Sequence, residues 1–502
     1  MLVGRKQEIE TLRKFHESNE SEFLVVYGRR RVGKTFLVRQ YFKDRFFFYA
    51  TGIAPEDSDK TRFLVNLERF GKSLDQYGID QSGAPATWME AFDRLKEGIL
   101  ASRSPDRKVI FLDEMPWMDT PKSCFVNALE YFWNSFASAR TDVLLIACGS
   151  ASAWISRKLF NSRGGLHNRI TGRILLRPFT LGECEEYFRS RGIVIDRKDI
   201  AEAYMIFGGI PYYLKHWDGR YGLPQNIDRI VFREDAPLKN EFNNLYASLF
   251  SHSSQYIEVV RALGAKSKGL LREEILDNTS LTDGGTLSEI LKNLAASGFI
   301  RYYARFPGKT RNGLYQLIDN FSLFHLTFIE GNTGQNEHFW SDLHETPRLI
   351  TWRGYAYEQL CFKHIGQIKR ALGISGIAAD IYSWKSKKSD PGAQIDLVIS
   401  RSDRIANLCE VKFAKYEFEI KKDYADKLRN KVFAFGNETG GAATTHLTFI
   451  TTYGVKRNAH SNMVQSEVLL DDLFIDQIHK QALLDICHSA IPALPTYHKR
   501  FY

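Results

Sequence analysis

Residues 23–35 read FLVVYGRRRVGKT, and this stretch decides how the first part of the chain folds. Its apolar start, rich in branched and aromatic residues, predicts a buried strand ending at Gly28, and the apolar spacing after Lys34 predicts a helix. Backbone N–H groups of such a loop and of the helix N-terminus surround a phosphate, because glycines let the backbone approach closely. Strand, glycine loop and helix in this order therefore predict a nucleotide-binding α/β domain.

Every residue of this loop is a candidate nucleotide ligand. Lys34 is expected to reach the β- and γ-phosphates, and Thr35 is expected to place its hydroxyl on Mg²⁺. The run of arginines inside the loop is unusual, and it either attracts the anionic ligand or faces a partner. The candidate nucleotide ligands are Gly28, Arg29, Arg30, Arg31, Val32, Gly33, Lys34 and Thr35.

Two further strand patterns end on polar residues. The apolar run 109–112 is followed by Asp113 and Glu114, and the run 143–148 is followed closely by Ser150. Ligands of parallel α/β sheets bind at the carboxyl ends of the strands. We therefore expect Asp113 to hold Mg²⁺ through water, Glu114 to orient and deprotonate the attacking water, and Ser150 to sense the γ-phosphate.

Residues 2 to about 214 resemble the archaeal-type ATPases of the AAA/STAND group. The motifs that add to the nucleotide motifs are Val3-Gly4-Arg5 with Glu8, Cys148-Gly149-Ser150, Gly164-Gly165-Leu166-His167-Asn168-Arg169 and Gly208-Gly209-Ile210-Pro211-Tyr212-Tyr213-Leu214. The resemblance implies ATP as the cofactor and a Gly-Arg box near the adenine. It also implies that Pro211 starts a lid helix beside the nucleotide, which agrees with glycine as a helix stop and proline as a helix start.

Arginines after the third strand are candidates for a contact with the γ-phosphate. Arg169 and Arg173 follow that strand, and either guanidinium could reach the phosphate from the same chain or from a neighbouring subunit. The alternative is that both are surface arginines on a solvated loop. Arg169 is the catalytic candidate, and a homo-oligomer is the partner that a contribution from a neighbouring subunit would require.

Residues 241–330 change to short helices followed by two strand patterns, which predicts a winged-helix domain. The basic loop between the strands carries Lys309 and Arg311, which could meet the DNA backbone without sequence preference. The last helix offers few hydrogen-bond donors, so base-specific reading is not expected. A purely structural coupling role is the alternative to DNA contact.

A second candidate site lies on two strand patterns within residues 394–413. If these strands form a hairpin, the carboxylates of Asp396 and Glu410 can converge on one Mg²⁺, with Mn²⁺ as an alternative metal. Lys412 shares a face with Glu410 and could polarise a water or stabilise a pentavalent phosphate. Glu358, on a preceding helical pattern, could complete the metal shell.

Residues 350 to about 474 resemble the DUF234 domain that follows archaeal-type ATPase modules, and they are similar to the PD-(D/E)xK nuclease superfamily. The resemblance rests on Asp396 with Glu410-Val411-Lys412, although the Pro-Asp of the superfamily is replaced by Ile395-Asp396. It implies a helix-flanked mixed sheet and metal-dependent phosphodiester cleavage. Many regulatory proteins keep this fold with reduced activity. Runs 431–435 and 447–450 are expected to add strands to the sheet.

The predicted fold class is α/β, with several domains, because 502 residues exceed one ordinary core. The first domain is a P-loop NTPase with a helical lid, and the last has the α/β fold of restriction endonucleases. The expected boundaries are 1–178 for the ATPase core, 179–240 for the lid, 241–330 for the winged helix, 331–349 for a linker, 350–474 for the nuclease-like domain and 475–502 for a tail.

Composition narrows the class of protein. The chain is 44% apolar and 25% charged, as in soluble globular proteins, and no apolar run approaches the ~20 residues that span a bilayer. We therefore expect a cytoplasmic protein without a membrane partner. The 6 cysteines have no Cys-x-x-Cys spacing, which argues against a disulfide framework or a zinc knuckle and favours reduced, buried thiols. A net charge of +9 favours an anionic partner such as nucleic acid.

Two functions are compatible with these patterns. The leading hypothesis is a Mg²⁺-dependent ATPase whose nucleotide state controls a metal-dependent nuclease-like domain acting on DNA. The alternative is a regulatory or signalling ATPase of the STAND type, in which the winged helix and the nuclease fold serve as binding surfaces without cleavage. The presence of Asp396, Glu410 and Lys412 together favours cleavage, since a binding surface does not need all three.

Overall fold

A computed structural model describes residues 2–54, 59–150, 152–160, 166, 168–266, 268–303, 313–332, 336–343, 346–386, 392–441 and 443–475. The chain divides into two units. The first unit comprises Met1–Phe179 with Ile206–Thr346, and the second comprises Thr180–Met205 with Pro347–Tyr502. Residues 179–240, which we expected to form one helical lid, are therefore divided between the two units.

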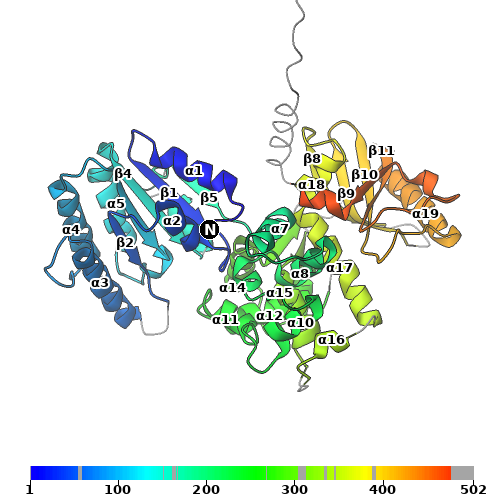
Figure 1. Cartoon of the computed structure of the whole chain (residues 1–502), viewed down its shortest axis with the longest axis horizontal. Helices are drawn as coiled ribbons and strands as arrows, with labels where there is room; N and C mark the ends of the chain where they lie inside the picture. Colours follow the sequence, from blue (N-terminus) through cyan, green and yellow to red (C-terminus); the bar gives the residue numbers. More distant parts are fainter. Residues whose placement is uncertain are drawn as a thin grey trace, which may run out of the picture. The chain divides into compact units, whose positions relative to one another are not determined.

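The first unit begins with an α/β domain, labelled in Figure 1. Its elements are α1 (Lys6–His16), β1 (Glu22–Tyr27), α2 (Lys34–Phe42), β2 (Phe48–Thr51), α3 (Asp59–Gln76), α4 (Trp88–Ala101), β3 (Lys108–Asp113), η1 (Met115–Trp117), α5 (Phe125–Ser135), β4 (Val143–Gly149), α6 (Ser152–Ile155) and β5 (Gly172–Leu175). The predicted strand, glycine loop and helix are β1, residues 28–33 and α2, so this prediction is confirmed.

The five strands of this domain form one parallel sheet in the order β2-β3-β4-β1-β5. Strand β4 lies between the strand of the phosphate loop and the strand that carries Asp113. In this register Tyr27 pairs with Gly149, and Leu112 pairs with Ala147. The carboxyl ends of β1, β3 and β4 therefore lie together, which confirms the expected meeting of the three polar strand ends.

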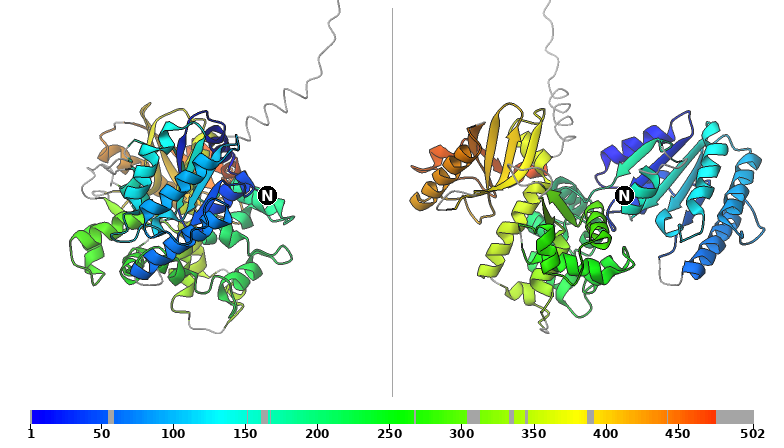
Figure 2. Two further views of the ribbon diagram at one scale, coloured as in Figure 1. Left: turned by 90° about the vertical axis from the view of Figure 1, so that its left-hand side faces the viewer. Right: turned by 180° about the vertical axis from the view of Figure 1, so that it is seen from behind.

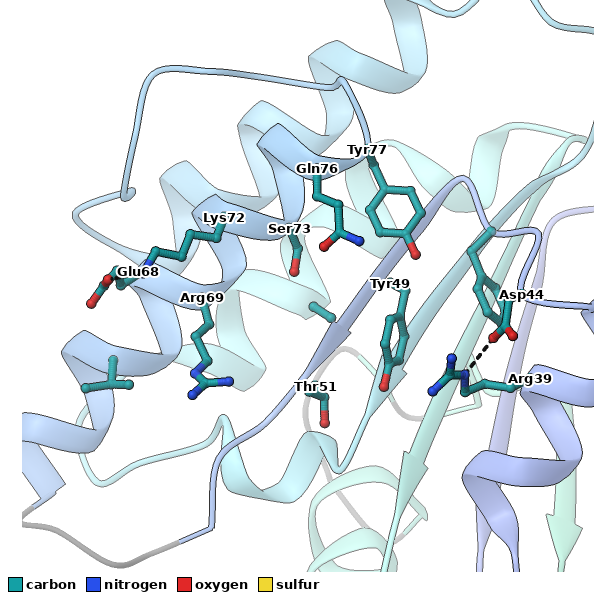
Figure 3. Close-up of a pocket in the computed structure, with 13 residues that line it drawn as sticks. Arg39, Asp44, Tyr49, Thr51, Glu68, Arg69, Lys72, Ser73, Gln76 and Tyr77 are labelled. Atoms are coloured by element: carbon teal, nitrogen blue, oxygen red, sulfur yellow. Dashed lines mark hydrogen bonds and ion pairs between the residues drawn. The ribbon is translucent and has the colours of Figure 1, made fainter.

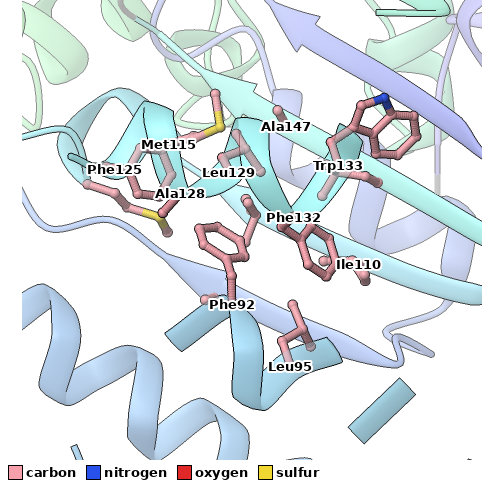
Figure 4. Close-up of a cluster of buried hydrophobic side chains, with 14 of the residues drawn as sticks. Phe92, Leu95, Ile110, Met115, Phe125, Ala128, Leu129, Phe132, Trp133 and Ala147 are labelled. Atoms are coloured by element: carbon pink, nitrogen blue, oxygen red, sulfur yellow. The ribbon is translucent and has the colours of Figure 1, made fainter. Parts of the chain in front are cut away.

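Aromatic and aliphatic side chains hold α4 and α5 on one face of this sheet (Figure 4). Phe92 of α4 and Phe132 of α5 are stacked with ring centroids 5.4 Å apart, over Ile110 of β3 and Ala147 of β4. Burying a Phe side chain stabilises a fold by about 1.5–3 kcal/mol relative to its exposure. The packing of this layer fixes β3 and β4, and thereby the polar residues at their ends.

The rest of the first unit is mainly helical and ends in a small hairpin. Its elements are α9 (Pro211–Leu214), α10 (Leu223–Ile227), α11 (Glu241–Ala247), α12 (Ser253–Gly264), α13 (Arg272–Asp277), α14 (Gly285–Ala296), β6 (Ile300–Tyr303), β7 (Leu314–Leu317), α15 (Asn320–Phe324) and α16 (Phe339–Asp342). Strands β6 and β7 pair antiparallel, and an isolated bridge joins Leu270 to Tyr315. The loop with Lys309 and Arg311 lies outside the described residues.

The second unit contains a mixed sheet with helices against it, as Figure 2 shows in yellow and orange. Its elements are α7 (Leu181–Ser190), most of α8 (Arg197–Phe207), α17 (Pro347–Lys363), α18 (Ile365–Ala371), β8 (Ala379–Lys385), β9 (Gln394–Arg401), β10 (Ile405–Lys412), α19 (Lys422–Glu438), β11 (Thr444–Thr451) and β12 (Ser466–Leu469). The strand order is β12-β11-β10-β9-β8, antiparallel from β8 to β10 and parallel from β10 to β12.

One predicted strand of this sheet is wrong and another is confirmed. Residues 447–450 lie in β11, as expected, but residues 431–435 lie in the middle of α19. The buried side chains of this helix include Ala425, Leu428 and Phe435, which recur at helical spacing. A short apolar run cannot be assigned to a strand or a helix by its own periodicity, and the longer pattern decides.

Long-range contacts attach α7 and α8 to the second unit. The backbone N–H of Leu181 donates to Nε2 of His364 at 3.1 Å, and Arg353 of α17 forms an ion pair with the buried Glu202 of α8 at 2.7 Å. These contacts explain why residues 180–205 separate from the helices that follow them in sequence.

The expectation of reduced, buried cysteines is met in part. Of the cysteines in the described ranges all are free; Cys148, Cys184, Cys361 and Cys409 are buried, whereas Cys124 is exposed and departs from the expectation of buried thiols. Cys487 lies outside the described residues. Within the described ranges, no helix has the length and apolar character that crossing a bilayer requires.

Candidate functional site

Glycines shape the phosphate loop in two different ways. Gly28 has a φ of +141°, and a Cβ at this position would lie 2.3 Å from the backbone oxygen of Leu176. Gly33, the N-cap of α2, has a φ of +91° and open space around the Cβ position. Only the backbone conformation therefore requires glycine at 33, whereas close backbone packing also requires it at 28.

Lys34 is held inside the loop. Its side chain is 5% exposed, and its Nζ donates to the backbone oxygens of Gly28 at 3.1 Å and Arg29 at 2.9 Å. These two oxygens fix the ammonium at the centre of the loop, where a phosphate is expected. A phosphate can replace the carbonyl oxygens as the acceptor, because an ammonium group attracts an anionic oxygen more strongly than a neutral one.

The predicted magnesium ligands lie within hydrogen-bonding distance of each other. Thr35 Oγ1 donates to Asp113 Oδ1 at 3.1 Å, and the Glu114 N–H donates to the same oxygen at 3.0 Å. Burial, together with the negative charge of Glu114, raises the pKa of Asp113 above the ordinary range of a carboxyl group. A hydroxyl and a carboxylate oxygen at this position suit Mg²⁺, which prefers hard oxygen ligands.

Hydrogen bonds join the predicted catalytic base, Glu114, to the predicted sensor, Ser150. Glu114 has a φ of +42°, a left-handed conformation that is rare for a non-glycine residue. Its Oε2 accepts hydrogen bonds from the Ser150 hydroxyl at 2.9 Å and from the Ser150 N–H at 3.1 Å. Ser150 is fully buried and contacts the predicted base directly. Its predicted role as a sensor would therefore act through Glu114.

The buried Arg5 anchors the end of the phosphate loop. Its guanidinium donates to the backbone oxygens of Arg177 at 2.8 Å and Val32 at 3.3 Å, and it lies over the Phe179 ring at 4.6 Å from the centroid. Arg5 therefore joins the loop to the segment after β5. The Gly-Arg box was noticed through the family resemblance, but this support of the loop was not predicted.

Two arginines of the phosphate loop are paired with carboxylates of the helical part of the same unit. Arg29 Nη1 lies 2.5 Å from Asp319 Oδ1, and both side chains are buried. Arg31 Nη2 lies 2.6 Å from Glu241 Oε2, and the Arg31 guanidinium stacks on Tyr212 at 3.9 Å from the ring centroid. These two arginines are thus held by carboxylates of the same chain, and the two alternatives left open by the sequence stay predictions.

Residues near Pro211 connect with the same network. Pro211 occupies the first turn of α9, after Gly208 and Gly209, which both have a φ of +67°. The predicted helix stop and start are thus confirmed. Two residues later, the Tyr213 hydroxyl donates to Glu241 Oε1 at 2.8 Å, so the carboxylate that binds Arg31 is also held from this motif.

The arginines after β4 lie on the surface. Arg169 is exposed, and Arg173 is exposed with its guanidinium 4.0 Å from the centroid of the Phe160 ring. The motif residues Gly164, Gly165 and His167 lie outside the described residues. The role of Arg169 at the γ-phosphate stays a prediction.

In the second unit, the two predicted carboxylates lie at facing positions of neighbouring strands. The antiparallel register of β9 and β10 ends with Leu397 opposite Cys409, so Asp396 and Glu410 follow opposite each other. Facing residues of an antiparallel pair point to the same side of the sheet. Asp396, Glu410 and Lys412 thus share one face, as the period of two predicted.

Glu410 is enclosed by hydrogen-bond donors. It is 1% exposed, and its carboxylate accepts from the Tyr424 hydroxyl at 2.7 Å and from the Lys431 ammonium, with the Lys412 ammonium at 3.5 Å. Burial and the neighbouring Glu410 raise the pKa of Tyr424. Tyr424 and Lys431 lie on α19 and were missed by the sequence interpretation, which assigned residues 431–435 to a strand.

The described residues gather no set of metal ligands at this second site. Glu358 lies on α17, and in the described part of the chain no three His, Cys, Asp or Glu side chains gather in a way that could hold a metal ion. Both oxygens of Glu410 are engaged by Lys431, Tyr424 and Lys412. The metal roles of Glu358, Asp396 and Glu410 stay predictions.

A cavity of about 770 Å³ lies along the edge strand β2, between α3 and the end of α2 (Figure 3). It borders the nucleotide site, because Thr51 at its margin pairs with Asp113 in the sheet. Arg39 pairs with Asp44 at 2.6 Å and Lys72 with Glu68 at 2.5 Å, so much of its charge is compensated. The sequence interpretation did not include this cavity.

Comparison with known proteins gives a family match for the first part of the chain. Residues 2–217 match the family described as an ATPase domain predominantly from Archaea. The relatives include an uncharacterized protein of Methanocaldococcus jannaschii, which is 25% identical over 443 residues, covering 86% of this chain and 91% of the relative. An uncharacterized ATP-binding protein of the same organism is 40% identical over 45 residues, covering 9% of this chain and 76% of the relative.

Similar solved structures include a Walker-type ATPase and ORC proteins. A Walker-type ATPase of Pyrococcus abyssi has a TM-score of 0.46 at 18% identity and covers 65% of this chain and 96% of that chain. The ORC2 protein of Aeropyrum pernix, in ADPNP and ADP complexes, has a TM-score of 0.39 at 15% identity and covers 65% of this chain and 92% of that chain.

Replacing the predicted base should separate nucleotide binding from hydrolysis. We expect Glu114→Gln to bind ATP but to hydrolyse it about 100-fold to 10,000-fold more slowly, because a general base contributes this much. Lys34→Ala should lose nucleotide binding, and Glu97→Gln, an exposed change on α4, should have no effect. Titration with a fluorescent nucleotide and steady-state phosphate release measure both quantities, and unchanged turnover in Glu114→Gln would remove Glu114 from this role.

The raised pKa of Asp113 predicts a stability effect with a definite sign. A carboxyl whose folded pKa exceeds its unfolded value of about 3.9 destabilises the folded protein as the pH rises through this interval. Without nucleotide at pH 7–8, Asp113→Asn should therefore unfold at a higher temperature than wild type. The stabilisation of the wild type by ATP with Mg²⁺ should be lost in the variant. Thermal unfolding with and without the nucleotide decides, and a variant that is less stable without nucleotide would contradict the prediction.

Proposed function

We propose that the protein is a nucleotide-driven switch, because residues 2–217 match the family described as an ATPase domain predominantly from Archaea. ATP binding and hydrolysis at the phosphate loop would control the C-terminal unit, which would act on the backbone of DNA. The observation that carries the switch is the pairing of Arg29 with Asp319 and of Arg31 with Glu241, since both arginines belong to the phosphate loop.

The chemistry of hydrolysis is supported by the groups at the strand ends. Lys34 would bind the β- and γ-phosphates, and Thr35 and Asp113 would hold Mg²⁺, which neutralises phosphate charge when it is bound. Glu114 would accept a proton from the attacking water. Both hydrogen bonds from Ser150 are accepted by Oε2 of Glu114, so Oε1 would be the oxygen that takes the proton while Ser150 holds the carboxylate in place.

Coupling is supported by what the two paired carboxylates do elsewhere. Asp319 is the N-cap of α15, and its Oδ2 accepts from the Ser322 N–H at 2.9 Å and the Ser322 hydroxyl at 2.7 Å. Glu241 lies at the start of α11 and is held by Tyr213. A loop that closes on a phosphate would move Arg29 and Arg31, and their partners would transmit the movement to both helices.

The size of this coupling is sufficient for a switch. Breaking a buried ion pair on one side costs about 3–5 kcal/mol. A ligand that prefers one conformation by about 5.5 kcal/mol moves an equilibrium from 1:99 to 99:1. The Arg29–Asp319 pair alone is therefore of the order that nucleotide binding can oppose.

The action on DNA rests on charge and on the arrangement of the second unit. The chain has a net charge of +9, and the Lys412 and Lys431 side chains beside Glu410 are 28% and 20% exposed. The helices and hairpin from α12 to β7 have the order of a winged helix, which would add backbone contacts. Two ammonium groups next to each other suit a phosphodiester, which they would bind without reading the sequence.

Cleavage and binding without cleavage are the two forms of this proposal. The placement of Asp396, Glu410 and Lys412 on one face favours metal-dependent cleavage. The engagement of Glu410 by Lys431 and Tyr424 favours a binding surface, because a metal would have to displace Lys431. Incubation of the full chain with plasmid DNA, linear DNA and RNA, with Mg²⁺ or Mn²⁺ and with or without ATP, tests which form holds.

If the second unit cleaves DNA, Asp396→Ala and Glu410→Ala should each reduce cleavage to the background level, while ATP hydrolysis stays within about twofold of wild type. Lys412→Ala should bind the metal but cleave poorly, since it acts on the water and the transition state. Asp403→Ala, an exposed acid on the turn between β9 and β10, is the matched control and should cleave normally. Gel assays of plasmid nicking give the readout. The binding form replaces the nuclease if the wild type cuts no substrate.

The Arg29–Asp319 pair predicts non-additive stability effects. Arg29→Met and Asp319→Asn should each destabilise the first unit by about 3–5 kcal/mol, because each leaves the other charge buried and uncompensated. The double variant should lose less than the sum of the two single losses. Asp283→Asn, an exposed acid paired with Arg272 at 2.7 Å, is the control and should change stability little. Thermal unfolding is the measurement, and additive losses would exclude the pair as a coupled unit.

A further inference from the structure

The three consecutive arginines of the phosphate loop differ in their partners. Arg29 and Arg31 are each paired with a carboxylate. Arg30, between them, forms no ion pair with any carboxylate in the described part of the chain. Its guanidinium lies 5.5 Å from the centroid of the Trp117 ring, and its Nη1 reaches the backbone oxygen of Ser248 at 3.5 Å.

These contacts position Arg30 without neutralising its charge. The side chain is half-buried, and a hydrogen bond of 3.5 Å to a neutral carbonyl is at the long limit of such bonds. Burial of a cation without a counter-ion is unfavourable, and an arriving anion removes this penalty. The half-buried position and the weak contact with a neutral carbonyl thus hold the Arg30 guanidinium in place and leave its charge available to an anionic ligand.

Arg30 also lies beside the predicted base. Trp117 belongs to η1, whose N-cap is Glu114. Burial lowers the pKa of Arg30, and the nearby Glu114 carboxylate acts in the opposite direction. Arg30, which forms no ion pair with a carboxylate in the described residues, therefore lies within electrostatic reach of the group that is expected to activate the water.

We propose that Arg30 is a catalytic residue of ATP hydrolysis that places its guanidinium on the γ-phosphate, from the same chain and beside Glu114. This inference rests on the proposed ATPase function. It assigns to Arg30 the role that the sequence gave to Arg169, which is exposed. A neighbouring subunit is then not required to complete the site.

In the proposed reaction the protonation state of Arg30 does not change. Water attacks the γ-phosphorus while the bond from this phosphorus to the β–γ bridging oxygen breaks. Glu114 takes a proton from the water, ADP leaves with the electron pair of the broken bond, and inorganic phosphate is the second product. Arg30 stays protonated throughout and binds the γ-phosphoryl oxygens, where charge is spread in the transition state.

The test compares Arg30→Ala, Arg30→Gln and Arg30→Lys with the wild type. We expect Arg30→Ala and Arg30→Gln to lower ATP turnover by at least about 100-fold. Affinity for ADP, which lacks the γ-phosphate, should stay within about threefold. Trapping of ADP with aluminium fluoride, which mimics the transferring phosphoryl group, should be lost in both variants and partly retained in Arg30→Lys. Arg103→Ala, on an exposed arginine after α4, is the matched control and should hydrolyse and trap normally. Arg169→Ala is measured beside it to test the alternative assignment.

Several outcomes would overturn the assignment. If Arg30→Ala and Arg30→Gln turn over within threefold of an active wild type, Arg30 has no catalytic role. Parallel loss of ADP affinity and turnover in both variants would make Arg30 a structural or general anion contact. Loss of turnover and trapping in Arg169→Ala, with Arg30→Ala unaffected, would return the role to Arg169. A wild type that hydrolyses no ATP would refute the ATPase proposal itself, and this inference with it.

Discussion

The buried ion pair between Arg29 and Asp319 joins the loop that is built for phosphates to the helical part of the first unit. In the described part of the chain neither group forms a second ion pair, and each charge would be costly to bury alone. The pair therefore holds the α15 N-terminus and the phosphate loop in one arrangement. Arg31 with Glu241 repeats this design at a more exposed position. Two ion pairs thus connect the candidate nucleotide site to helices that are far away in the sequence.

Several groups of the nucleotide site already have partners that a substrate would have to replace. Lys34 binds carbonyl oxygens of its own loop, and Glu114 binds Ser150. Exchange of these hydrogen bonds for bonds to phosphate and water costs little, because each lost bond is replaced. Arg30 differs in lacking an ion-pair partner in the described residues. In the proposed reaction Lys34 and Glu114 would therefore exchange hydrogen-bond partners, whereas Arg30 would gain an anionic partner.

The candidate site of the second unit also combines carboxylates with cations, but here the cations surround one carboxylate. Asp396 and Glu410 face one another, as in a metal site, but two lysines and a tyrosine surround Glu410. The same donors that would neutralise a phosphodiester also neutralise the carboxylate. In the proposed function, cleavage would require a metal to compete with Lys431 for Glu410. Either form is compatible with the proposed control by nucleotide binding in the first unit.

Local patterns determined much of this protein. The order of strand, glycine loop and helix, the carboxylates after β3, the stop at Gly208 and the shared face of Glu410 and Lys412 could be predicted because each depends on neighbours within one or two elements. Only the tertiary structure decided that Arg29 meets Asp319, that Ser150 binds Glu114 and that Lys431 lies on a helix and reaches Glu410. The physical reason is that such contacts join residues distant in sequence, whose encounter depends on sheet order and helix packing and leaves no periodic signal.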